Sequence, residues 1–147
     1  MYTLSEKAVG KLLEGYNCAQ AVLYAGCDRL PLERDAALRL ACGLGAGMGR
    51  KEEVCGAVSG GILALGLRYG RGEKEDRSHT ETTYAKTREL MDRFAAKHGS
   101  CICRDLLGGC ELLTEEGQRH YKANDLLNKT CKPCVQTVGE ILEDLLQ

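Results

Sequence analysis

Apolar residues recur at helical spacing along most of this sequence, and glycine, proline or polar clusters interrupt them. The first such segment follows a stretch of capping-box form, "TLSE" at Thr3 to Glu6, and should end near Gly15. Asn17 is placed to cap a second helix, and a third starts beside Pro31. Further helices are expected over roughly 53–68, in a long segment that ends at Gly99, over 114–127 and over 130–146.

Strand patterns are missing from the sequence. No segment shows sustained two-residue alternation of apolar and polar positions between hairpin turns. We therefore predict an all-α fold, a single-domain helical bundle of about six to seven helices. A chain of 147 residues suits one domain better than two. Because neither an internal repeat nor a dividing linker is visible, the domain is expected to span residues 1–147.

The charge balance argues against two classes of partner, nucleic acid and anionic membranes. The chain carries 20 Lys and Arg against 21 Asp and Glu, a net charge of -1, so it lacks the basic surface that nucleic acid or an anionic membrane attracts. In the N-terminal stretch, "MYTLSEKAVGKLLEGY", charges interrupt every apolar run, which fits neither a secretory signal nor a membrane span. We expect a cytoplasmic protein that binds neither nucleic acid nor membrane.

Cysteine is in strong excess. Nine cysteines in a protein of a reducing compartment are more often metal-binding or redox-active than a disulfide framework. The three histidines, His79, His98 and His120, share no spacing with the cysteines and are expected on solvated helix surfaces. The candidate chemistry therefore belongs to the thiols.

Four cysteines fall at or near predicted helix starts: Cys18, Cys55, Cys103 and Cys131. The positive end of the helix dipole and its free N–H groups stabilise a thiolate there and lower its pKa from about 8.5 toward 3.5–7.5. If the four thiols share a centre, the second, fourth and last helices should converge their N-termini on one site. The alternative is that each is a small buried apolar residue. Basic residues that could offset the thiolate charge stand nearby in sequence, at Arg50, Lys51, Arg104, Lys129 and Lys132.

The predicted helix that begins near Cys55 has mostly very small side chains in its first half. Residues 55–61 read "CGAVSGG", although glycine costs about 1 kcal/mol relative to alanine inside a helix. Something must therefore approach this face closely, either the backbone of a neighbouring helix or a cofactor lying on Cys55. Gly56, Ser59 and Gly60 are the candidate cofactor contacts, and both explanations can hold at once.

Four blocks of the sequence together resemble a known family. They read "GYNCAQAVL" at 15–23, "GAGMGRKEEVCGAVSGGILALGL" at 45–67, "CRDLLG" at 103–108 and, near the C-terminus, "CKPCVQTVGEILEDLL". Over nearly its whole length the chain is similar to the redox-active family named for its C_GCAxxG_C_C cysteine signature. The "CGAxxG" element of that signature stands here at residues 55–60.

The resemblance implies a redox role and places the family's four cysteines at Cys18, Cys55, Cys103 and Cys131. The chain is also similar to the N-terminal, cluster-bearing part of split-Soret cytochromes, which implies an iron–sulfur cluster as cofactor. Covalent c-type haem is not expected, because the chain has no Cys-x-x-Cys-His. The cysteines outside the family's four are Cys27, Cys42, Cys101, Cys110 and Cys134.

Three kinds of site remain open. Four thiolates satisfy an iron–sulfur cluster and equally a tetrahedral structural zinc, and the resemblance, the bare helix face and the surplus thiols favour the cluster. Metal-free thiol chemistry is the other alternative. Cys131 and Cys134 form a "CKPC" motif of thioredoxin type, although the βαβ context is missing, and this pair could form a disulfide when metal is absent.

No set of residues indicates substrate turnover. The alternating glycines of "GLGAGMG", residues 43–49, match neither a dinucleotide motif nor a P-loop, which favours a connector or a wall of the site beside Cys55. Neither an acid–base pair nor a Ser/His/Asp set stands out, so no catalytic residue is assigned. We expect electron transfer or redox sensing with an unidentified redox partner protein, and apolar residues on both sides of the helix over roughly 53–68 predict a homodimer.

Overall fold

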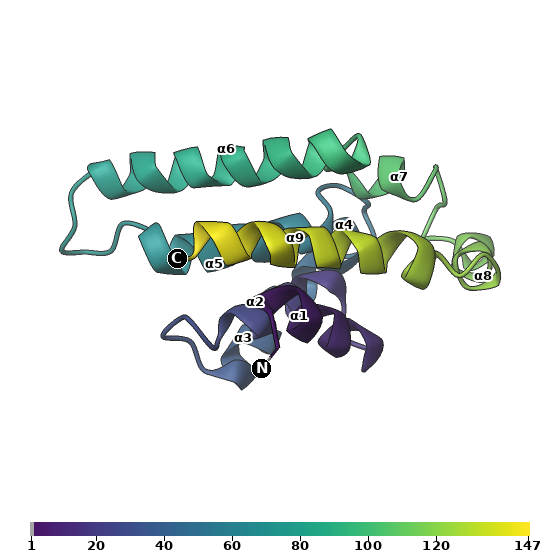
Figure 1. Ribbon diagram of the computed structural model, residues 1–147. Helices are drawn as coiled ribbons and strands as arrows, with labels where there is room; N and C mark the ends of the chain where they lie inside the picture. Colours follow the sequence, from purple (N-terminus) through teal and green to yellow (C-terminus); the bar gives the residue numbers. More distant parts are fainter. Residues whose placement is uncertain (1) are drawn as a thin grey trace.

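The structure, a computed structural model, describes residues 2–147, which form helices joined by loops (Figure 1). Among these residues the one strand-like pairing is an isolated antiparallel bridge between Val54 and Ile102. The prediction of an all-α helical bundle is confirmed. In chain order the elements are α1 (Leu4–Leu13), α2 (Cys18–Gly26), α3 (Arg34–Ala41), the 3₁₀ turn η1 (Cys42–Leu44), α4 (Gly45–Met48), α5 (Gly56–Tyr69), α6 (Ser78–His98), α7 (Cys103–Leu106), α8 (Glu115–Ala123), the π-helical turn η2 (Leu127–Cys131) and α9 (Lys132–Leu145).

Helices α5 and α9 run through the middle of the bundle. Helix α6 lies along one side of them and α1, α2 and α3 lie on the other, while α7 and α8 stand at the end where α5 and α9 begin (Figure 1). The apolar stripes of these helices meet in one core. Its largest fully buried side chains are Phe94, Leu23, Leu65, Leu90, Leu142, Val22, Val58, Val135 and Val138.

Two helices, α1 and α2, begin at their predicted caps, and two others, α3 and α5, begin later than predicted. The side chains of Thr3 and Asn17 accept hydrogen bonds from the backbone of α1 and α2, and Asn17 forms a reciprocal capping box. Helix α3 begins later than predicted, because the Glu33 side chain supplies its cap. Helix α5 also begins later, at Gly56, because the chain before it is engaged in the bridge at Val54.

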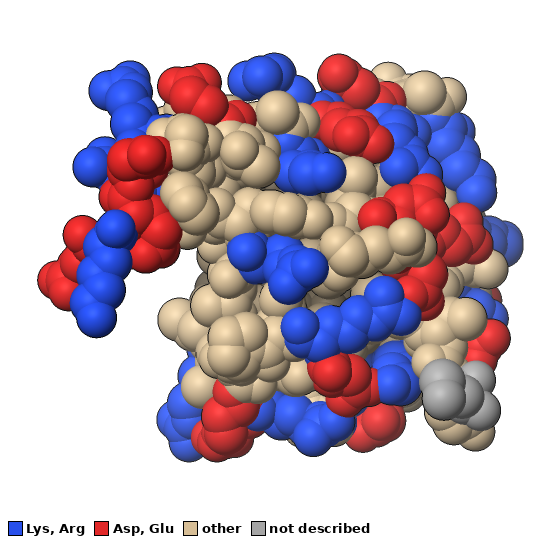
Figure 2. All heavy atoms as spheres, turned by 60° about the vertical axis from the view of Figure 1, so that its left-hand side comes forward, with Lys and Arg blue, Asp and Glu red and all other residues tan. Residues whose placement is uncertain are grey.

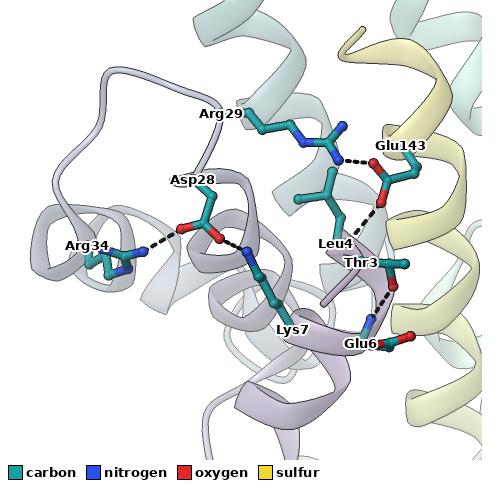
Figure 3. Close-up of polar contacts among 8 residues, drawn as sticks. All are labelled: Thr3, Leu4, Glu6, Lys7, Asp28, Arg29, Arg34 and Glu143. Atoms are coloured by element: carbon teal, nitrogen blue, oxygen red, sulfur yellow. Dashed lines mark hydrogen bonds and ion pairs between the residues drawn. The ribbon is translucent and has the colours of Figure 1, made fainter. Parts of the chain in front are cut away.

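Polar contacts tie α1 to α9 and to the connection between α2 and α3 (Figure 3). Glu143 of α9 accepts from the backbone N–H of Leu4 at 3.0 Å and pairs with Arg29. Asp28 pairs with Lys7 and Arg34. Such partly exposed ion pairs contribute about 0–1 kcal/mol each, so packing dominates here as well.

The surface carries both signs of charge. On the face drawn in Figure 2, acidic and basic side chains are interspersed, without a broad area of one sign. None of the helices in residues 2–147 combines the length and the apolar character that a bilayer span needs. The domain bounds, residues 1–147, stay a prediction, and Met1 lies outside the described residues.

Candidate functional site

A cavity of about 280 Å³ lies where α2, α5 and α9 begin, at the end of the bundle that carries α7 and α8 (Figure 1). Five thiols line it: Cys18, Cys55, Cys103, Cys131 and Cys134. The four cysteines singled out in the sequence therefore surround one cavity, together with a fifth that was not among them.

The bridge between Val54 and Ile102 explains how Cys55 and Cys103 come together. The Cys55 N–H donates to the Cys101 carbonyl at 2.7 Å, and the Cys103 N–H donates to the Glu53 carbonyl at 2.6 Å. Two chain segments that are far apart in sequence thus enter α5 and α7 side by side. A single bridge leaves no two-residue alternation in the sequence, so the pattern of apolar positions could not reveal it.

The glycine-rich segment forms a wall of the cavity in a left-handed backbone conformation. Positive φ angles run through most of residues 46–52, including the non-glycine residues Ala46, Met48, Arg50 and Glu52. The turn is closed by N–H groups of residues 52 and 53, which donate to the carbonyls of residues 46 and 47 at 3.3 and 2.9 Å. A Cβ on Gly47 would lie 2.7 Å from the Cys103 Cβ, so this close approach requires glycine.

Glu52 carries a buried carboxylate behind this wall. The residue is 3% exposed, and its Oε2 accepts from the Leu112 N–H at 3.2 Å. Its Oε1 has no hydrogen-bond partner in the structure. An unpaired buried carboxylate oxygen and a left-handed non-glycine backbone both cost free energy, and such costs concentrate at functional sites.

Close helix packing accounts for much of the bare face of α5. A Cβ on Gly60 would lie 2.7 Å from the Ala19 carbonyl oxygen of α2, and one on Gly56 would lie 3.2 Å from the Cys18 Cβ. The Ser59 hydroxyl donates to the Gly56 carbonyl at 3.2 Å within α5. Of the three predicted cofactor contacts, Gly56 lines the cavity, whereas Ser59 and Gly60 do not.

Cys18 and Cys131 form the first of two thiol pairs across the helices. A hydrogen bond from the Cys18 thiol lowers the pKa of Cys131 to about 7, and it raises the pKa of Cys18 well above its ordinary value. The Tyr121 hydroxyl of α8 lies 3.2 Å from the Cys131 sulfur and lowers the pKa of Cys131 further. Burial raises the pKa of Tyr121, so this hydroxyl keeps its proton and acts as the donor.

Cys55 and Cys134 form the second pair. A hydrogen bond from the Cys134 thiol lowers the pKa of Cys55, and the first N–H groups of α5, at Ala57 and Val58, add to this effect. The same contact raises the pKa of Cys134. Cys103 stands apart from both pairs, and burial raises its pKa to about 12.

The expectation that helix starts lower the pKa of all four thiols is therefore wrong in part. It holds for Cys55, whose thiolate receives backbone N–H groups of α5. Cys131 ends the π-helical turn η2 with a helical backbone that continues into α9, so its low pKa comes from the donors Cys18 and Tyr121. Cys103 opens a helix of four residues, too short for a substantial dipole, and burial dominates there.

Two basic side chains line the cavity, Arg50 and Lys122. Arg50 belongs to the predicted set, while Lys51, Arg104, Lys129 and Lys132 lie elsewhere. Sequence reasoning missed Lys122 and Tyr121 because both stand on α8, which has no motif. Cys134 was visible as part of the "CKPC" motif, but its contact with Cys55 was not.

The remaining cysteines have separate environments. The thiols of Cys27, Cys101 and Cys110 donate to the carbonyls of residues 23, 91 and 117, at 3.6, 3.4 and 3.1 Å. Cys42 is exposed. None of these four lines the cavity.

The thiols are spread around the cavity and do not converge on one point. Within residues 2–147, no three His, Cys, Asp or Glu side chains come close enough together to hold a single metal ion. The donor set of the cavity is thus five thiols that lie around its wall.

Comparison with known proteins identifies a family. The family model described as "Putative redox-active protein (C_GCAxxG_C_C)" matches residues 16–145. The chain therefore belongs to this family, as its cysteine blocks indicated. Searches of curated proteins and of solved structures found no match.

Proposed function

We propose that this member of the redox-active C_GCAxxG_C_C family binds an iron–sulfur cluster in its thiol-lined cavity and uses it for electron transfer or redox sensing. Cys18, Cys55, Cys103 and Cys131 would supply the thiolates. The observation that carries the proposal is that these four thiols, from separate parts of the chain, line one cavity.

The donor set fits a cluster better than a single zinc ion. A tetrahedral zinc site needs four ligand atoms about 2.0–2.3 Å from one point, whereas the thiols here are spread around the cavity. In a cluster the thiolates bind different irons and do not converge on one ion, which matches ligands arranged around a space. When bound, such a cluster supplies an electron-transfer couple whose potential depends on hydrogen bonds to the sulfurs, on net charge and on solvent exposure.

The chain's own residues would hold the negative charge of the site. Arg50 and Lys122 place two cations on the cavity wall. The first N–H groups of α5 point at the Cys55 sulfur, and the Tyr121 hydroxyl contacts the Cys131 sulfur. Gly56 packs closely against Cys18 and also lines the cavity, so it is the small residue of α5 that we retain as a cofactor contact.

Anaerobic purification followed by iron and acid-labile sulfide analysis tests the proposal. We expect both elements together with a brown visible spectrum, and we expect Cys55→Ser to lose them. Cys42→Ser is the matched control, because Cys42 is exposed and lies outside the cavity.

Two results would overturn the cluster. A colourless protein with one tightly held zinc would favour the structural metal site, and a protein that takes up no iron after reconstitution would favour metal-free thiol chemistry. Equal iron loss in both cysteine variants would also contradict the assignment of Cys55 as a ligand.

The redox partner protein and the homodimer remain predictions. The exposed apolar residues on α5 that support a dimer are Leu63 and Leu67. A single monomeric species in light scattering at high micromolar concentration would remove the dimer.

A further inference from the structure

We propose that the mouth of the thiol-lined cavity binds a small organic carboxylate with an apolar body. Arg50 and Lys122 would hold the carboxylate group, and the leucines of the cavity wall would contact the body. This ligand would lie beside the proposed cluster, and in that respect the inference rests on the proposed function, whereas binding itself does not require a cluster.

Arg50 and Lys122 mark the mouth of the cavity. Both side chains line it and both residues are exposed, whereas Cys55, Cys103 and Cys134 are at most 8% exposed. Arg50 stands on the left-handed turn before α5 and Lys122 stands on α8, so two separate segments bring a cation to the same opening. The cations therefore lie on the solvent side of the cavity, and these three thiols lie deeper.

The fixed charge of the cavity wall is of one sign. Apart from thiols that ionise, no acidic side chain among residues 2–147 lines the cavity, although the whole chain carries 21 Asp and Glu. Within the same described residues, neither Arg50 nor Lys122 forms an ion pair. An opening with cations of one sign and low-dielectric walls focuses the electric field and concentrates counter-ions. The mouth therefore attracts an anion.

The rest of the wall is mostly apolar. Five leucines line the cavity: Leu12, Leu106, Leu107, Leu112 and Leu127. Tyr16, which is 37% exposed, adds an aromatic ring to the lining. Ligand pockets commonly combine apolar walls with a few polar or charged groups that fix the orientation of the ligand. The leucines and the tyrosine thus suit an apolar body, and the two cations suit one anionic group.

A carboxylate fits this combination better than a phosphate ester does. The planar guanidinium of arginine matches a carboxylate in a bidentate contact, and a single charged group leaves the remainder of the ligand apolar. A phosphate group carries nearly two charges and three strong acceptor oxygens, so it needs more donors. The volume of about 280 Å³ corresponds to roughly nine water molecules at about 30 Å³ each. That space suits a ligand as small as phenylacetate.

Titration with phenylacetate tests the proposal. Calorimetry measures binding to the full chain as purified anaerobically and after a chelator has removed metal under reducing conditions. Amide spectra of the isotope-labelled metal-free chain map the site, and we expect saturable shifts at Leu107, Leu112 and Gln118, which line the cavity. Phenylacetamide lacks the charge and acetate lacks the body, so each should bind at least about threefold more weakly than phenylacetate.

Substitutions that remove one charge identify the cations. Arg50→Gln and Lys122→Gln should each weaken phenylacetate binding roughly threefold to tenfold and leave phenylacetamide binding unchanged. Lys51→Gln and Arg119→Gln are the matched controls, because they remove the same charge from the same two segments but lie outside the cavity. They should leave the affinity unchanged. All four positions are exposed, so the fold should persist, and the amide spectrum of each variant checks this.

Equal affinities in all four variants would overturn the proposal, as would equal binding of phenylacetate and phenylacetamide. Tighter binding of inorganic phosphate than of phenylacetate would also contradict it, because the apolar wall would then contribute nothing. So would loss of phenylacetate binding when a cluster is present, because the ligand is placed beside the cluster. Iron analysis separates the two proposals. Iron-free protein that binds phenylacetate refutes the cluster alone, whereas iron-loaded protein that binds none refutes the carboxylate site alone.

Discussion

The two ends of the bundle are built differently. Where α5 and α9 finish, the helices are regular, and contacts such as the Tyr69 hydroxyl on the Leu145 carbonyl join them. Where they begin, the chain contains a left-handed turn, a π-helical turn and the unpaired carboxylate oxygen of Glu52. All non-glycine residues with positive φ among residues 2–147 lie toward this second end: Ala46, Met48, Arg50, Glu52 and Asp125.

This difference indicates where the fold gives up stability. Each sparsely populated backbone conformation costs about 1–3 kcal/mol and persists only where the surrounding structure enforces it. Here the strained segments form the walls that hold the thiols, at Ala46, Gly47 and Arg50. The regular end supplies the packing free energy that offsets these costs.

The largest expected effect comes from filling the contact between α2 and α5. Gly60→Ala should lower the free energy of unfolding by about 1–3 kcal/mol, because the new Cβ would lie 2.7 Å from the Ala19 carbonyl oxygen. Gly66→Ala is the matched control in the same helix. No atom lies within 4 Å of its added Cβ, so it should raise stability by about 0.5–1 kcal/mol.

Denaturant unfolding measures both variants. Equal and small effects at the two positions would mean that α2 and α5 are not in close backbone contact near the cavity. The bare face of α5 would then need another explanation, and a bound cofactor would become the stronger one.

The regular end could be predicted from the sequence, and the irregular end only in part. Helical spacing and the cap at Thr3 located α1 correctly, and the cap at Asn17 located the start of α2 even beside the cavity, because these signals are local. The cysteine pattern selected thiols that do surround one cavity. The bridge at Val54, the thiol pairing and the position of Tyr121 depend on contacts between distant segments, and no local pattern encodes them.

The next effect concerns the thiol environment that α8 provides. Tyr121→Phe removes a donor to Cys131, whose pKa is lowered to about 7 by hydrogen bonds from Cys18 and then Tyr121. Loss of a donor to a thiolate raises its pKa, so less thiolate is present at neutral pH. One such hydrogen bond, worth about 1.5 kcal/mol, raises the pKa by about one unit and corresponds to about sevenfold slower alkylation of Cys131 at pH 7.

Mass spectrometry of the metal-free protein treated with iodoacetamide measures this rate. Tyr84→Phe is the control, because Tyr84 is exposed on α6 and lies outside the cavity. An unchanged rate in Tyr121→Phe would show that Cys18 alone sets the state of the Cys131 thiol.

The smallest expected effect is also the most direct test of the difference between the two ends, because it makes the same type of change at each. Met48→Gly relieves a left-handed residue with φ 70° and should raise the free energy of unfolding by about 0.5–1 kcal/mol. Removing the left-handed strain contributes about 1–2 kcal/mol, and the greater conformational entropy of glycine in the unfolded chain takes back about 0.4–1 kcal/mol. Ala85→Gly, at an exposed position inside the regular helix α6, should lower it by about 0.5–1 kcal/mol. Opposite signs in denaturant unfolding would place the strain in the cavity wall. If Met48→Gly destabilises the protein as much as Ala85→Gly does, the left-handed turn is not strained, and the cavity is held without the cost that we assign to it.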